Sequence, residues 1–382
     1  MQWPRTPVER VQLFQPPFCP WPACPEHHRR TRRFRFRHHG FYSTRRRVVP
    51  RFLCLACRRT FSRQTFSSSY YLKRPELLLS LASALQAGSA LRQAGRSLAC
   101  APSTLTRLAA RLGRHALLLH SRALALLRGR LAEPIVLDHF ETFEFSQDLP
   151  FGVATPVGSF SWFVYGLDPV PHARTGRRSL IQQRRVRSRA TRPSRGGYRG
   201  STRRILDSLL PLVPEGQHLE LLGDGHPAYD EVGGHHPRVH LQRFPNPRRG
   251  PRGSPRSALA LARDRAMFPA DVLHALLRHT VAHHRRETIA FGRRLNALLE
   301  RLFLAAVWRN FIKRRSERRP EKVTPAMRVG LADEPWTWKR VLSRRLFPGR
   351  ESLTPMEQQL YRRAWTTPVL PRNTSHALKH AY

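Results

Sequence analysis

Four of the chain's five cysteines fall within its first 57 residues, and they form two short pairs. Cys19 and Cys24 make a C-x4-C pair, and Cys54 and Cys57 make a C-x2-C pair. Two chelating loops about thirty residues apart can place four thiolates around one zinc ion, because each loop turns its two sulfurs to the same side. Four thiolates leave no open position for water, so the zinc predicted here is structural.

The segment that carries these cysteines, residues 1–70, has few aliphatic residues. It cannot bury a core of its own and needs such a staple. Between the pairs, RRFRFRHHGFYSTRRR alternates arginine with aromatic residues, which favours strands. We therefore predict a zinc ribbon over residues 1–70. The alternatives are cysteines that cluster without a metal, and His27 or His28 in place of one cysteine ligand.

Charge limits the partners of this chain. Lys and Arg number 68 against 25 Asp and Glu, a formal net charge of +43. Self-repulsion on this scale favours a polyanion as partner, and nucleic acid is the obvious one. Prolines and cysteines interrupt any signal-like run near the N-terminus, and no apolar run is long enough for a membrane span. We expect a cytoplasmic protein with no membrane contact.

Residues 71–130 are rich in Leu, Ala, Ser and Arg at helical spacing. We expect three or four short helices, one ending near Gly88, a second from Ser89 to about Ala99, and a third that opens with the capping sequence PSTLTR. This layout is typical of a helix-turn-helix, whose last helix enters the major groove. A three-helix bundle used for dimerisation fits the same pattern. The residues expected to face DNA are Ser103, Thr104, Thr106 and Arg107.

Residues 131–318 alternate β-type runs with helical ones, which predicts an α/β domain. The expected strands are PIVLDHFETF, SFSWFVYGL, SLIQQRRV, HLELLGDG and RVHLQRF. The helix STRRILDSLLPLV precedes the last two, and a long helical region follows from about Ser257 to Arg315. The C-terminal tail, residues 319–382, has no role that its sequence indicates.

Arginine is concentrated in residues 173–204, where twelve occur. Such a segment can follow a DNA backbone, which gives affinity without sequence choice. A solvated loop is the alternative. The arginines expected to contact DNA are Arg184, Arg185 and Arg187.

Two acids stand at polar breaks in apolar strands. Asp138 interrupts PIVLDHFETF, and Asp224 lies between two glycines after HLELL. If these strands are neighbours, both carboxylates reach one edge of the sheet, where only a cation relieves their repulsion. Mg²⁺, or Mn²⁺ in its place, suits such oxygen ligands. Glu287 in HHRRETIAFGRRL is the candidate third acid, and Glu300 is the alternative.

Metal ions held by three such acids can activate a water or a 3′-hydroxyl for in-line attack on a phosphodiester. Each acid also has an ordinary structural explanation. Asp138 could cap a strand end, Asp224 could form the turn that Asp-Gly commonly makes, and Glu287 could be a solvated helix charge paired with arginine.

The order of these motifs resembles the DDE transposases of bacterial insertion sequences. It runs from the ribbon ending FLCLACRRTFS through the helix-turn-helix to LDHFETF, GDGHPAYD, HHRRETIAFGRRL and VWRNFIK, and it covers about residues 15–315. The resemblance implies a ribonuclease H-like domain, a mixed sheet flanked by helices, whose catalytic triad falls on Asp138, Asp224 and Glu287. Tyr229 matches the tyrosine of the second motif. Gly223 replaces the usual Thr, and His139 stands where the family often has Glu.

By this resemblance the chain is a metal-dependent transposase. It would bind double-stranded DNA at its element's ends and at the target, act as a homo-oligomer, and work at the bacterial nucleoid. Two other functions remain open on the sequence. One is a DNA-binding regulator that keeps the fold without the chemistry, and the other is an RNA-binding ribbon protein.

Overall fold

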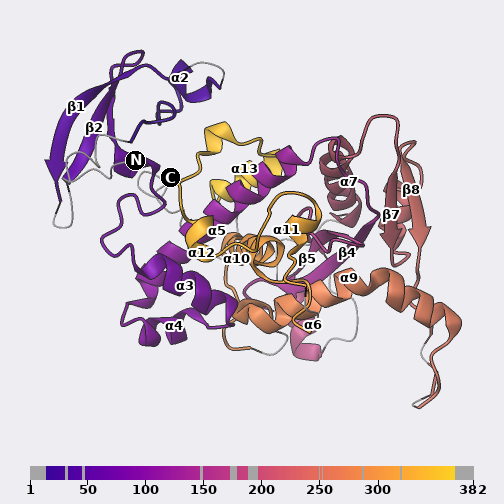
Figure 1. The fold of residues 1–382 in the computed structure, drawn as a ribbon. Coiled ribbons are helices and arrows are strands. Elements are labelled where there is room, and N and C mark those ends of the chain that lie inside the picture. The colour runs from indigo at the N-terminus through magenta and orange to yellow at the C-terminus, as the bar shows by residue number, and fades with distance from the viewer. Residues whose placement is uncertain are drawn as a thin grey trace.

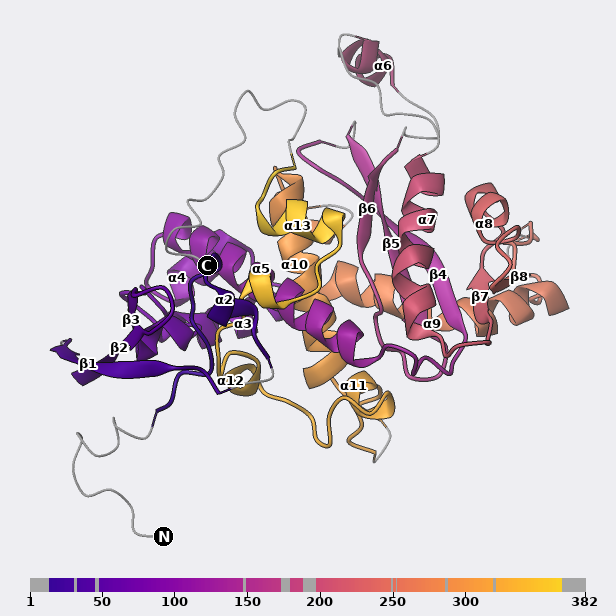
Figure 2. The same ribbon diagram turned by 90° about the horizontal axis from the view of Figure 1, so that it is seen from above.

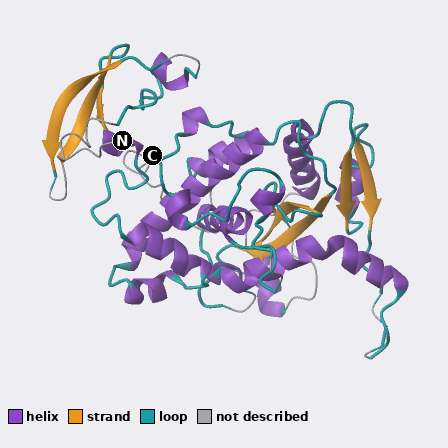
Figure 3. Ribbon diagram, viewed as in Figure 1, coloured by secondary structure: helices purple, strands orange, loops and turns teal. Residues whose placement is uncertain are grey.

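The computed structural model describes residues 14–30, 33–44, 48–146, 149–172, 179–187, 197–248, 250–251, 253–285, 288–318 and 321–365. Within these residues the chain is mixed α/β (Figure 1). A small three-stranded sheet lies at the N-terminal end, and a five-stranded mixed sheet flanked by helices forms the larger part (Figure 3). No helix in these ranges has the length and apolar character that a membrane crossing requires.

The N-terminal sheet is an antiparallel ribbon in the order β1-β2-β3. Its elements are α2 (Pro25–His28), β1 (Phe36–Ser43), β2 (Val48–Cys54), β3 (Thr60–Ser62) and the 3₁₀ turn η1 (Arg63–Phe66). Strand β1 is solvent-exposed over almost its whole length. The core beneath the ribbon consists of cysteine sulfurs and phenylalanine rings instead of aliphatic residues, as the composition predicts.

Three helices follow: α3 (Leu77–Gln86), α4 (Leu91–Ser97) and α5 (Pro102–Leu126). The first two match the expected bounds. The third is a single helix of 25 residues and not a short one. It begins with Pro102 after Ala101, and no side chain caps it. The fixed backbone of proline at the first helical position therefore starts α5, where we expected a hydroxyl cap.

The large sheet has the order β6-β5-β4-β7-β8. Its strands are β4 (Ile135–Phe143), β5 (Pro150–Gly158), β6 (Asp168–Pro171), β7 (Leu219–Gly223) and β8 (Val239–Arg243). Strands β4, β5 and β6 form an antiparallel meander. Strands β7 and β8 extend the sheet parallel to β4.

Two of the expected strands are wrong. Most of SFSWFVYGL is a turn and loop in which Trp162 has a φ of +63° and only Val164 bridges to a strand. The strand here is the preceding PFGVATPVG, which is buried at nearly every position and so lacks the alternation of a half-exposed strand. SLIQQRRV lies in a helix, α6 (Leu180–Arg187).

Helices cover both faces of this sheet (Figure 2). They are α7 (Gly197–Leu209) with its 3₁₀ extension η2 (Leu210–Leu212), α8 (Pro227–Val232), α9 (Ala258–Thr280), η3 (Ala282–His284), α10 (Leu295–Val307) and the π-helical turn η4 (Trp308–Ile312). Helix α9 packs on β4, β5 and β7, and α7 packs on β5 and β6. The long helical region expected from Ser257 is thus two helices, separated by a break after Thr280.

The C-terminal segment, which we define as residues 321–365, belongs to the packed structure. It contains α11 (Pro325–Arg328), α12 (Trp338–Val341), η5 (Pro348–Arg350) and α13 (Pro355–Tyr361). Its Val341, Leu346 and Leu360 are buried in the main core. It also contacts the ribbon, where the Arg345 N–H donates to the Phe66 carbonyl at 2.9 Å. The two ends of the described chain are therefore joined.

Candidate metal centre and acidic cavity

The four cysteines predicted as zinc ligands meet at one point. Their sulfurs all lie within 4.8 Å of one another. The Sγ atoms of Cys19 and Cys57 are 3.7 Å apart, and those of Cys24 and Cys54 are 3.8 Å apart. Sulfurs at about 2.3 Å from a tetrahedral zinc are separated by about 3.8 Å. The cluster is therefore compatible with a structural zinc site.

Histidine takes no part in this cluster. The Nδ1 atom of His27 bonds to the Cys19 carbonyl at 2.8 Å, and its ring packs edge-on against Phe18. Burial raises the pKa of the Cys19 thiol. A bound zinc ion would displace that proton, because the metal takes the thiolate form.

The two predicted aspartates lie next to each other at the point where strand β7 ends beside the middle of β4. Strands β4 and β7 are parallel neighbours in which Leu137 pairs with Gly223, so Asp138 and Asp224 follow at the same level. Both line a cavity of 810 Å³ whose other walls are mostly histidine and tyrosine. The convergence that the sequence predicts for these two acids is thus present in the fold.

Asp138 lies in surroundings that disfavour its charge. Burial, and then the negative charge of Asp224, raise its pKa to about 7. The His139 N–H, which donates to Oδ1 at 2.7 Å, opposes this shift only in part. A carboxyl group in this state loses its proton readily to a competing cation.

Helix α9 brings His274 against Asp138. The Thr155 hydroxyl donates its only hydrogen to the Asp138 carbonyl at 3.0 Å, so the His274 Nε2–H must donate to Thr155, 2.8 Å away. Burial, and then Arg278, lower the pKa of His274 to about 3, so its ring is neutral. Its Nδ1 lone pair therefore faces Asp138 Oδ2 at 3.5 Å. Only a proton or a metal ion between these atoms makes the contact favourable.

The loop of Asp224 forms the local turn that Asp-Gly favours. The His226 N–H donates to Asp224 Oδ1 at 3.1 Å. Gly225 has a φ of +83°, which glycine adopts without strain. Gly223 has a different purpose, because a Cβ there would come within 3.0 Å of the Tyr229 ring. The two glycines therefore shape the turn and make room for a tyrosine.

Tyr229, the tyrosine of the second motif, is buried beneath the cavity. Its hydroxyl bonds to His139 Nδ1 at 2.7 Å, and the two rings stack. His139 also contacts the Ser201 hydroxyl at 3.3 Å and the Tyr198 ring. Because His139 points away from Asp138 along the strand, this network holds β4 against α7 and α8. His139, Tyr198 and Tyr229 also line the cavity that Asp138 and Asp224 line.

The third acid is less simple. Glu287 lies outside the described residues, so its assignment stays a prediction. Glu300 lies on α10, where its backbone and Cβ pack directly against Gly113 of α5. Its carboxylate pairs with Arg363 at 3.0 Å, both groups being buried. Glu300 does not line the acidic cavity, and its side chain forms a buried ion pair in the core instead.

Asp271 is an acid that the sequence analysis missed. It precedes His274 by one turn of α9, so both side chains lie on the same face of that helix. Its negative charge contributes to the raised pKa of Asp138. Asp271 is paired with Arg263 at 2.5 Å, and Arg263 in turn favours the charged form of Asp138. The signal in the sequence is an acid three residues before a histidine in PADVLHALL.

The carboxylates do not form a closed metal cage by themselves. Among the described residues, the four cysteines are the one group of three or more metal-binding side chains held within 4.8 Å. Three described carboxylates line the acidic cavity, those of Asp138, Glu141 and Asp224, whereas Asp271 is not among the lining residues and acts on Asp138 through its charge. Carboxylate oxygens are the ligands that Mg²⁺ prefers. No three of the described carboxylates converge within 4.8 Å as the four cysteine sulfurs do.

The residues expected to bind DNA are accessible where they are described. Ser103, Thr104, Thr106 and Arg107 are exposed on the first turns of α5, while Leu105 between them is buried. Arg184 is exposed on α6. Arg185 and Arg187 belong to the same helix, but their side chains lie outside the described part.

Comparisons of the chain with models of protein families, with curated proteins and with solved structures found no match. The geometry of the cysteine cluster and of the acidic cavity therefore carries the functional proposal.

Proposed function

We propose that this protein is a DDE-type transposase that cleaves and joins DNA strands with the acids of its large sheet. The observation that carries the proposal is the pairing of β4 with β7, which sets Asp138 and Asp224 side by side above one cavity. The mixed sheet with helices on both faces supports a ribonuclease H-like catalytic domain.

In this proposal the two aspartates hold Mg²⁺ and a third acid completes the set. When bound, the metal would activate the attacking oxygen and stabilise the leaving one. Asp138 gives up its proton as the cation binds, because its pKa near 7 reflects burial and the charge of Asp224. His274, oriented by Thr155, directs its lone pair at the same position. We favour Asp271 as the third acid, with Glu287 as the alternative that the sequence resemblance implies.

The DNA-binding parts of the proposal rest on exposure and charge. The exposed hydroxyl and arginine side chains on α5 have the position that a recognition helix needs. Helix α4 approaches this turn closely, since a Cβ on Gly95 would lie 2.9 Å from the Cys100 carbonyl. The cysteine cluster would hold the ribbon rigid for contacts with the phosphate backbone.

A cleavage assay tests this function. The substrate is a supercoiled plasmid that carries the genomic DNA flanking the coding region. We expect nicking and strand joining with Mg²⁺ and none without a divalent ion. Asp224→Asn should lower the rate about a hundredfold or more. Circular dichroism and zinc content of the variant, unchanged from the wild type, would show that the fold is intact.

Two observations favour a regulator without chemistry. Asp224 is already used in a local turn, and no third carboxylate in the described residues closes on Asp138. Such a protein would bind the same DNA and leave it uncut, in the wild type as in the variant. That result would reject the enzyme and keep the binding function.

A further inference from the structure

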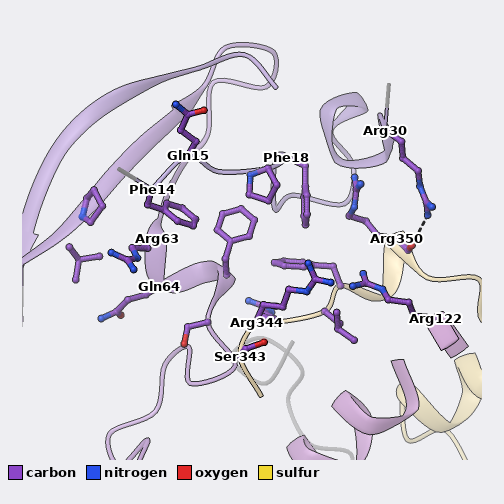
Figure 4. A pocket seen from close by; sticks show the side chains of 18 of the residues that line it. Phe14, Gln15, Phe18, Arg30, Arg63, Gln64, Arg122, Ser343, Arg344 and Arg350 are labelled. Atoms are coloured by element: carbon purple, nitrogen blue, oxygen red, sulfur yellow. Dashed lines mark hydrogen bonds between the residues drawn. The ribbon is translucent and has the colours of Figure 1, made fainter. Parts of the chain in front are cut away.

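A second large cavity, of 640 Å³, lies between the ribbon and the C-terminal segment (Figure 4). Its floor is aromatic, with Phe14, Phe18 and Phe66 from the N-terminal part and Phe347 from the C-terminal segment. Its arginines come from three parts of the chain: Arg29, Arg30 and Arg63 from the N-terminal part, Arg122 from α5, and Arg344, Arg345 and Arg350 from the C-terminal segment.

Positive charge in this cavity is largely uncompensated. None of the described residues that line it is acidic. Arg29 is neutralised by Glu26 at 2.5 Å, and Arg122 by Glu351 at 2.5 Å and 3.1 Å. Four more lining arginines form no ion pair with a carboxylate of the described chain: Arg30, Arg63, Arg344 and Arg350. So many cations in one space, without a described carboxylate to offset them, favour a bound anion.

Several of these side chains are already held in place. The Arg350 guanidinium donates to the His27 carbonyl and lies 4.0 Å from the centre of the Phe18 ring. Arg30 donates to the Arg350 carbonyl at 2.7 Å. Burial, and then the charge of Arg30, lower the pKa of Arg350. A ligand would find this part of the cavity ordered in advance, which reduces the entropy lost on binding.

Arg63 and Arg344 differ from Arg350 because their side chains are exposed to solvent. Both are exposed, and Figure 4 shows them in the same space on its two sides, Arg63 from η1 and Arg344 from the C-terminal segment. The Arg63 guanidinium lies 5.5 Å from the centre of the Phe14 ring, and neither side chain forms an ion pair with a described carboxylate, so both can make the bidentate hydrogen bonds that arginine forms with phosphate. They are the natural first contacts for an anion that enters.

The basic surface continues beyond the cavity. Arg33 donates to Gln15, a lining residue, at 3.3 Å. Exposed Arg35 and Arg37 follow, the latter on the open strand β1. A single phosphate or a free nucleotide would leave this extension unused. A ligand with a repeating phosphate charge would fill both.

We propose that this cavity seats the phosphate backbone of duplex DNA, which makes the C-terminal segment part of the DNA-binding surface. The choice of DNA rests on the proposed function, whereas the phosphate chemistry rests on the arginines alone. Contacts of this kind position the protein on its substrate and add affinity independent of sequence.

The test compares two double variants of the full-length protein. Arg63→Ala with Arg344→Ala removes two cavity charges, and Arg318→Ala with Arg362→Ala removes two exposed charges outside it. Binding of a fluorescein-labelled DNA duplex of random sequence is measured by anisotropy from 50 to 200 mM salt. We expect the cavity variant to bind about tenfold more weakly. The slope of log affinity against log salt should fall by about 1.8, as for two lost phosphate contacts.

Equal losses in the two double variants would overturn the proposal, because general charge would then explain the binding. Tighter wild-type binding of a structured RNA than of the duplex, lost in the cavity variant, would overturn it in favour of RNA. If the cavity variant keeps wild-type affinity while the wild type still nicks the cognate plasmid, the cavity proposal fails and the transposase stands. If the wild type binds no duplex, both fail.

Folding is checked by zinc content and melting temperature. Should the double variant melt early, Arg344→Glu replaces it, because that exposed side chain makes no ion pair in the described structure. A charge reversal there should weaken duplex binding more than Arg318→Glu does, and an equal effect would count against the cavity.

Discussion

The Nδ1 atom of His274 lies 3.5 Å from Oδ2 of Asp138, with its lone pair directed at the carboxyl group. Two acceptors in this position repel each other unless a proton or a cation lies between them. The arrangement couples the protonation of Asp138 to the stability of the fold and to the metal binding proposed above, and both can be measured.

We predict that Asp138→Asn stabilises the protein at pH 8 when no divalent ion is added. The pKa of Asp138 is about 7 in the fold against an ordinary 3.8. The stability of the protonated form is therefore complete below about pH 3.8 and is lost as the pH rises towards 7. The side-chain amide of the variant can donate a hydrogen bond to His274 Nδ1 at every pH. The free energy of unfolding of Asp138→Asn should therefore exceed that of the wild type by about 2–4 kcal/mol at pH 8. Its gain should shrink at pH 4.5. Thermal unfolding at both pH values measures the difference.

The matched control for this experiment is Asp333→Asn, which removes one exposed carboxylate. It should shift the melting temperature little at either pH. An Asp138→Asn protein that is less stable than the wild type at pH 8 would contradict the environment described for this carboxyl group.

Magnesium should stabilise the wild type but neither Asp138→Asn nor Asp224→Asn. A cation at ten times its Kd stabilises the folded state by about 1.4 kcal/mol. The effect should grow as the pH rises through 7, because the cation competes with the proton on Asp138. Melting temperatures with and without Mg²⁺ at pH 6 and pH 8 test this. A rise of equal size in all three proteins would place the ion elsewhere.

The third acid can be identified by comparing Asp271→Asn with Glu287→Gln in the plasmid assay. We expect Asp271→Asn to lower cleavage about a hundredfold. Asp271 shares the face of α9 that carries His274, and its charge reaches Asp138. Glu287→Gln should retain more than about a tenth of the activity, a loss under 1.4 kcal/mol. The reverse order of losses would assign the role to Glu287.

Loss of one cysteine ligand should release the zinc. We expect Cys54→Ser to purify with well under one zinc per chain and to expose the ribbon to proteolysis, because metal binding supplies its folding free energy. Cys100→Ser is the control, since Cys100 lies outside the cluster. Full zinc content in Cys54→Ser would show that the cysteines do not act together.

Glu300→Ala should destabilise the protein by about 3–5 kcal/mol, because it leaves the buried guanidinium of Arg363 without its carboxylate. Glu334→Ala, which breaks an exposed pair with Arg340, should cost less than about 1 kcal/mol. Urea unfolding measures both. Similar values for the two variants would argue against a core role for Glu300.

The parts of the fold that the sequence predicts are those set by local pattern. The paired cysteines, the strands that carry Asp138 and Asp224, and the helix boundaries near Gly88 depend on neighbours within a few residues. The sequence does not predict strand β5, because burial on both faces removes the alternation of apolar and polar residues. The sequence also does not show that Gly113 lets α10 pack closely on α5, because that contact joins residues far apart in the chain.

The sequence does not predict that Asp271 lies near Asp138, for a related reason. The helical pattern continues past Thr280, so the sequence alone does not reveal that the helix breaks there. Only residues before the break lie on the helix that covers β4. The sequence also does not predict the packing of the C-terminal segment. Each of its short helices buries too few residues to show a helical period of apolar residues.

The hydrogen bond between the Arg345 N–H and the Phe66 carbonyl joins two residues that the ribosome adds to the chain at widely separated times. A ribosome adds about 5–20 residues per second, so the ribbon emerges some tens of seconds before the segment that docks on it. During that interval its four cysteines can come together, but the arginine-lined cavity cannot form. A nascent chain would therefore complete this cavity only after the C-terminal segment has been synthesised.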